Sequence, residues 1–200
     1  WFLLFLSKKK ILRAIGIPLL IFTLLSTTAW AVAFTSIYTK PHTRIQASEW
    51  IYKNIPSKST LLVEHWDESL PSSFPGKNPS LYTYLDMPLY ESENKGKIQT
   101  MTSNLSQGDY LIMTSRRVIN GITQAPLQYP ITNKYYEKLF EGSLGYSLVA
   151  QFTSYPQIAG FTFNDNAAEG SFQSYDHPVV YIFSRVKTLS EQEILDQLYD

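Results

Sequence analysis

The first forty residues are far more apolar than the rest of the chain. From Ile11 to Tyr38 the only charged residue is Arg13, at the near end of the run, where its side chain can extend to lipid headgroups. A helix needs about 20 apolar residues to cross the hydrocarbon core of a bilayer, so this run is long enough. Trp30 and Tyr38 lie toward its far end, where interfacial aromatic residues are common. The pattern predicts a transmembrane helix.

A second apolar piece precedes this run. Residues 1–6 are all apolar, and residues 7–10 read Ser-Lys-Lys-Lys. We therefore expect residues 1–38 to hold the end of one span, a tight basic loop and a last transmembrane helix of a multi-span cell-membrane protein. Lysines in short loops mark the cytoplasmic side, which places residues 39–200 outside the cytoplasm. The alternatives are a single-span anchor and a signal peptide, and a signal peptide would need a shorter apolar run.

Residues 39–200 alternate between helical and strand-like patterns. Apolar residues recur with the helical period in four segments: 43–55, 92–105, 133–141 and 191–198. Strand-like apolar runs occupy five others: 60–63, 81–85, 109–114, 146–153 and 179–183. This alternation predicts an α/β layered domain with a small mixed sheet that follows the transmembrane α-helix.

Local signals at the ends of these segments predict where helices begin and stop. Thr43 with Gln46 fits a capping box, and Thr132 and Ser190 are expected N-caps. Gly108 and Gly142 are expected to end the helices that precede them.

Composition excludes several classes of protein. The net charge is zero, which argues against nucleic acid as a partner because phosphate binding needs a basic face. The absence of cysteine excludes disulfides, thiolate metal sites and a cysteine nucleophile. No glycine-rich phosphate-binding motif and no G-x-S-x-G nucleophile motif occurs. We expect no cofactor and no metal, since the oxygen-rich segment 164–169 lacks calcium-loop spacing.

A cluster of polar and aromatic residues follows the first predicted strand: Glu64, His65, Trp66, Asp67 and Glu68. In open α/β sheets, ligands bind beyond the carboxyl ends of strands. Such a cluster can bind a sugar or a cation. For a sugar, the indole of Trp66 can stack on the ring while carboxylates accept hydrogen bonds from its hydroxyl groups. The alternative is a polar loop in which Trp66 covers the core.

A second cluster, Ser115, Arg116 and Arg117, follows the strand predicted at 109–114. If the two strands are parallel, both clusters lie at one edge of the sheet. Guanidinium groups suit phosphate or carboxylate, so a lipid phosphate or a sugar diphosphate is a fitting ligand. The alternative is an internal ion pair between one of these arginines and Glu64 or Asp67.

Several phrases of the sequence together resemble a known group of membrane enzymes. They are Ala47–Ile51, Glu64–Pro71, Asp109–Arg117, Tyr135–Phe140 and Ser171–Phe183, the last with Tyr-Asp-His-Pro-Val as its most specific part. This order resembles the C-terminal extracytoplasmic region of large multi-span glycosyltransferases. The group comprises dolichyl-phosphate-mannose protein mannosyltransferases, aminoarabinose lipid A transferases and related YYY-domain membrane proteins.

The resemblance implies an enzyme that moves a sugar from a polyprenyl-phosphate donor to an acceptor outside the cytoplasm. In that group the catalytic acid lies in the first extracytoplasmic loop, to which no position here corresponds. No catalytic residue is therefore carried over, and these residues alone are expected to be inactive. The expected partners are the lipid bilayer, a polyprenyl-phosphate sugar and an acceptor. The alternative is a membrane-anchored, non-enzymatic binding or assembly module.

Overall fold

A computed structural model describes residues 10–168 and 170–200, which form two compact units. The first unit comprises Trp1–Lys40 and Tyr155–Asp165, and the second comprises Pro41–Ser154 and Asn166–Asp200. The apolar piece and the first lysines of the basic loop expected at residues 1–9 lie outside the described residues.

The first unit is built on a long apolar helix, α2 (Lys10–Thr35), followed by one 3₁₀ turn, η1 (Ser36–Thr39). At a rise of 1.5 Å per residue its 26 residues extend about 39 Å, against about 30 Å for a hydrocarbon core. Most of its large apolar side chains are exposed, and it contains Pro18. A helix long and apolar enough to span a membrane is therefore present where the sequence predicts one.

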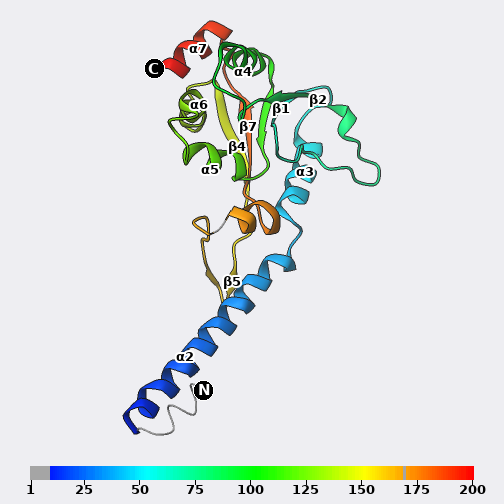
Figure 1. The fold of residues 1–200 in the computed structure, drawn as a ribbon. Coiled ribbons are helices and arrows are strands. Elements are labelled where there is room, and N and C mark those ends of the chain that lie inside the picture. Colours follow the sequence, from blue (N-terminus) through cyan, green and yellow to red (C-terminus); the bar gives the residue numbers. More distant parts are fainter. Residues whose placement is uncertain (1–9, 169) are drawn as a thin grey trace. The chain divides into compact units, whose positions relative to one another are not determined.

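A small hairpin lies against the end of this helix (Figure 1). Its strands, β5 (Gln157–Ile158) and β6 (Phe161–Thr162), are antiparallel. Ala159 and Gly160 join them with φ of 49° and 84°, the left-handed backbone that two-residue hairpin turns require. The hydrophobic pattern did not predict this hairpin, because two-residue strands are too short to show a period.

The second unit is an α/β domain around a five-stranded mixed sheet of order β2-β1-β3-β7-β4. The strands are β1 (Thr60–Glu64), β2 (Thr83–Met87), β3 (Tyr110–Met113), β4 (Tyr146–Phe152) and β7 (Val180–Arg185). Strand β1 pairs in parallel with β2 and β3, whereas β7 is antiparallel to β3 and β4. The predicted α/β fold with a mixed sheet is confirmed.

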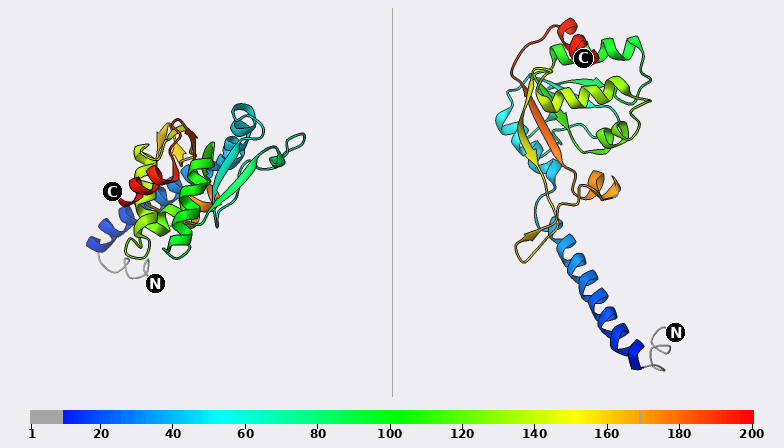
Figure 2. Two further views of the ribbon diagram at one scale, coloured as in Figure 1. Left: turned by 90° about the horizontal axis from the view of Figure 1, so that it is seen from above. Right: turned by 90° about the vertical axis from the view of Figure 1, so that its left-hand side faces the viewer.

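Helices cover both faces of the sheet (Figure 2). They are α3 (Thr43–Asn54), α4 (Lys95–Gln107), α5 (Arg117–Thr123), α6 (Pro130–Glu141) and α7 (Glu191–Tyr199). Leu62 of β1 joins the core beneath α4, α5, α6 and α7, while its neighbour Leu61 joins the core beneath α3. Successive strand side chains point to opposite faces, so one apolar strand serves both cores.

Three of the predicted helix ends are confirmed and two are wrong. Ser190 caps α7 in a full capping box, and Gly108 and Gly142 follow α4 and α6. The N-cap of α3 is His42, whose ring accepts a hydrogen bond from the Arg44 backbone N–H, whereas Thr43 is already helical. Thr132 lies inside α6, which begins two residues earlier because Pro130 suits a first helical turn. The sequence pattern also missed the short helix α5.

Candidate functional site

The parallel pairing of β1 and β3 brings the two predicted clusters to one edge of the sheet. Val63 pairs with Ile112, so the loop after β1 and the turn after β3 leave the sheet side by side. The clusters do approach, since Arg117 Nη1 donates to the Trp66 carbonyl at 3.4 Å. The prediction that both clusters share an edge is confirmed.

A third arginine, which the sequence analysis did not select, organises this edge. Arg44 of α3 is almost buried and donates to the Thr114 carbonyl at 3.2 Å and the Ser174 carbonyl at 3.1 Å. It also pairs with Asp67 at 3.1 Å and with Glu68 at 3.0 Å. One guanidinium thus joins α3, the loop after β1, the end of β3 and the short π-helix η3 (Phe172–Asp176). Its position in a charged helix gave no local signal of that role.

Asp67 serves as an anchor of the loop and is not presented to solvent. It accepts from Arg44, from the Ser115 hydroxyl and from the Glu68 backbone at 2.9 Å. The internal ion pair considered for this edge exists, but its arginine is Arg44 in place of Arg116 or Arg117. The reason is geometric: α3 packs beneath the strand ends and directs Arg44 into the site, whereas Arg117 lies on the outer surface.

Glu64, at the end of β1, points into the core. Its Oε1 accepts from the Tyr136 hydroxyl at 2.5 Å, and its Oε2 has no hydrogen-bond partner among the described residues. Burial, with repulsion from Asp67 adding to it, outweighs that hydrogen bond and raises the pKa of Glu64 to about 8. A side chain so enclosed does not contact a ligand in solution, so Glu64 supports the site from within.

His65, Trp66 and Glu68 are the exposed members of the first cluster, and Glu68 pairs with Arg44. Trp66 is 64% exposed, and its backbone has a φ of 75°, which is uncommon for a bulky residue. The His65 and Trp66 rings lie 5.4 Å apart at a tilt of 33°. The alternative in which Trp66 covers the core is wrong, since the indole faces solvent.

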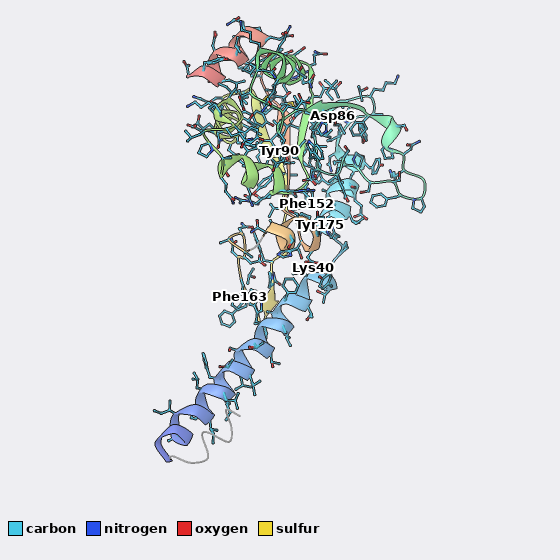
Figure 3. The ribbon with its side chains drawn as sticks, in the orientation of Figure 1. Lys40, Asp86, Tyr90, Phe152, Phe163 and Tyr175 are labelled. Carbon is cyan, nitrogen blue, oxygen red and sulfur yellow. The ribbon has the colours of Figure 1, made fainter. Side chains whose placement is uncertain are left out.

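The second cluster borders a surface hollow of about 340 Å³. Its lining combines Arg117 with amide, hydroxyl and aromatic groups: Asn120, Gly121, Gln124, Gly170, Ser171, Ser174 and Tyr175. Arg116 lies outside this lining and donates weakly to the Asn120 Oδ1 at 3.5 Å. Tyr175 is exposed beside the hollow and is labelled in Figure 3. Of the two arginines, Arg117 is the one placed to meet a ligand.

The remaining sequence candidates are not brought into this edge as ligands. In the described part of the chain, no three metal-ligating side chains come together. Asn164 and Asp165 belong to the first unit, and Glu169 lies outside the described residues. His177, which belongs to the Tyr-Asp-His-Pro-Val phrase of the resemblance, is buried and precedes Pro178. The Pro178 carbonyl accepts a hydrogen bond from the Thr43 hydroxyl, so this segment packs against α3.

The site thus presents an exposed indole, a guanidinium and a polar hollow, held by a buried ion-pair network. An aromatic ring face and a guanidinium group together can bind a sugar that carries a phosphate. Comparisons with protein-family models, with curated proteins and with solved structures found no match to this chain.

Proposed function

We propose that this chain is part of a multi-span membrane glycosyltransferase that takes a sugar from a polyprenyl-phosphate donor and delivers it outside the cytoplasm. In this proposal the α/β domain binds a sugar-bearing substrate and does not itself perform the transfer. Three observations support it: the sequence resemblance, the long apolar helix α2, and an α/β domain that follows the helix.

The observation that carries the proposal is the pairing of Trp66 with Arg117. The indole is exposed, and the adjoining guanidinium donates to the Trp66 carbonyl. A sugar ring can stack on the indole while the guanidinium binds the phosphate in a charge-assisted hydrogen bond. The left-handed backbone at Trp66 costs free energy and is often retained at ligand-binding positions.

One observation favours the alternative of a non-enzymatic binding module. Glu64 and Asp67, the carboxylates nearest the sheet edge, are occupied by Tyr136, Arg44 and Ser115. These two carboxylates are therefore held as internal supports, which is what a binding module without a catalytic acid at this position requires. Sugar transfer by the intact parent protein, measured with and without a deletion of this domain, discriminates the two functions.

The direct test measures binding to the chain reconstituted in lipid nanodiscs. It is titrated with a polyprenyl-phosphate hexose and with the polyprenyl phosphate that lacks the sugar. We expect saturable binding of the hexose compound and no sugar transfer. Trp66→Ala should weaken binding of the hexose compound only. Arg117→Ala should weaken binding of both ligands about tenfold or more, as expected for the loss of a charged hydrogen bond.

Matched controls are available on the same domain. Tyr199→Ala removes an aromatic side chain that is as exposed as Trp66, and Lys187→Ala removes an exposed positive charge. Both should bind like the unmodified chain. Equal affinities for the Trp66 variant and its control would refute the assignment of this surface, and a failure of either ligand to bind would refute the substrate class.

A further inference from the structure

The segment that carries the β5–β6 hairpin has an unusual charge pattern. No charged residue occurs between Glu141 and Asp165. The segment that the hairpin contacts, α2 with η1, likewise has no charged residue between Arg13 and Lys40. Two stretches that are distant in the sequence, both without charge, therefore meet in the first unit.

Specific contacts fix the hairpin to the last turns of α2 and to η1. The Gln157 backbone donates to the Ser36 hydroxyl at 2.8 Å. The Phe163 ring meets the Trp30 ring edge to face, with centroids 5.7 Å apart. Ala33 and Ile37 are buried in this unit although most of α2 is exposed. The hairpin is thus held against one end of the apolar helix.

The outer surface of this assembly is aromatic. Phe161 is 72% exposed, and Phe163, Trp30 and Tyr38 are exposed as well. Figure 3 shows Phe163 beside the helix. Aromatic residues gather at the boundary between hydrocarbon and water in membrane proteins, and this cluster surrounds the end of the only bilayer-length helix in the described residues.

The length of the helix gives the depth of this cluster. About 20 residues counted from Arg13 reach Ala33, which places Trp30 and the hairpin at the far boundary of the hydrocarbon. Strands β5 and β6 form a two-stranded sheet, and the edges of such a sheet do not enter hydrocarbon. The hairpin therefore suits the headgroup layer and no deeper position.

We infer that the hairpin segment Tyr155–Asp165 is an interfacial membrane anchor. It lies in the headgroup layer, directs Phe161 and Phe163 toward the lipid, and, through its contacts with Trp30 and Ser36, sets the depth of α2. The inference rests on the part of the proposed function that places α2 in a bilayer and does not depend on sugar transfer.

The absence of cysteine from the chain allows a direct test. Single cysteines are introduced as Phe161→Cys and Thr162→Cys in the hairpin, Leu25→Cys in α2 and Val186→Cys in the α/β domain, each at an exposed position. Each is labelled with a nitroxide, and the full chain is reconstituted in phosphatidylcholine vesicles. Collisions with oxygen, which partitions into lipid, and with a water-soluble nickel complex then report the depth of each label.

We expect the label at Leu25 to lie deep, the two hairpin labels to lie at headgroup depth, and the label at Val186 to be as accessible to nickel as a label in water. If the hairpin labels were as accessible to nickel as the label at Val186 while the label at Leu25 lay deep, the inference of an interfacial anchor would be overturned. The membrane placement of α2 would remain intact. A water-accessible Leu25 label would overturn both.

A second measurement tests whether the aromatic side chains matter. With the label at Leu25, Phe161→Ser together with Phe163→Ser should shift its depth, whereas Leu127→Ser, at an exposed apolar position of the α/β domain, should not. An unchanged depth in the double variant would show that the hairpin does not set the position of the helix.

Discussion

Arg44 of α3 and Asp67 of the loop after β1 form an ion pair of 3.1 Å, with side chains only 10% and 4% exposed. The pair joins a helix beneath the sheet to the loop that carries Trp66. A buried charge of this kind is costly without its partner, so the geometry of the candidate site depends on both residues.

We expect Arg44→Ala and Asp67→Asn each to destabilise the α/β domain by about 3–5 kcal/mol, because each leaves a buried group without its partner. The free energy of unfolding, from urea titration in detergent, measures this. Lys134→Ala is the control: it breaks a more exposed pair with Glu137 and should cost at most about 1 kcal/mol. Equal effects at Arg44 and Lys134 would contradict the role of the buried pair.

The buried Glu64 should make stability depend on pH. Its pKa of about 8 in the folded chain exceeds the value of 4.5 expected when unfolded. Between these values the folded state keeps a proton that the unfolded state releases, so this contribution is complete below pH 4.5 and is lost as pH rises through about 8. Unfolding free energies from pH 5 to 9 should fall by about 4 kcal/mol from this group.

Glu64→Gln should remove most of that decline, because the amide stays neutral and its carbonyl can still accept from Tyr136. Glu193→Gln is the control. The pKa of Glu193 is lowered by hydrogen bonds from Ser190, so its contribution has the opposite sign and is lost as pH falls. A decline that persists unchanged in Glu64→Gln would show that Glu64 titrates normally.

The left-handed backbone at Trp66 predicts an unusual order of stabilities. Trp66→Gly should be more stable than Trp66→Ala by about 1 kcal/mol, because glycine adopts a φ of 75° without strain. In helix α3 the order should reverse, with Trp50→Gly about 1 kcal/mol less stable than Trp50→Ala. Thermal unfolding of the four variants checks both signs, and the same order at the two positions would be inconsistent with the strained turn.

Gly121 of α5 lies where the Tyr90 side chain approaches the helix closely. A Cβ at Gly121 would lie 2.2 Å from the Tyr90 hydroxyl oxygen, so Gly121→Ala should destabilise by about 1–3 kcal/mol despite the better helix propensity of alanine. Tyr90→Phe removes that oxygen and should restore most of the loss in the double variant. A double-mutant cycle measures the coupling, and additive effects would refute the contact.

The sequence by itself determined the elements whose signal is local. The run from Ile11 to Tyr38 needs no partner to be recognised as bilayer-length. The continuous apolar runs are recognised as strands from their length and apolar content. Ser190 and Gly142 mark helix ends because a cap acts within one turn of the chain. The alternation of helical and strand-like segments sufficed to predict an α/β fold with a mixed sheet.

Only the tertiary structure decided which side chains meet at the sheet edge. The order β2-β1-β3-β7-β4 and the packing of α3 beneath it bring Arg44 to Asp67, and α6 brings Tyr136 to Glu64. These partners are 23 and 72 residues apart, a separation that leaves no periodic trace in the sequence. Burial then turned Glu64 and Asp67 from expected ligands into internal supports and left Trp66 and Arg117 facing solvent, because exposure depends on what packs against a residue.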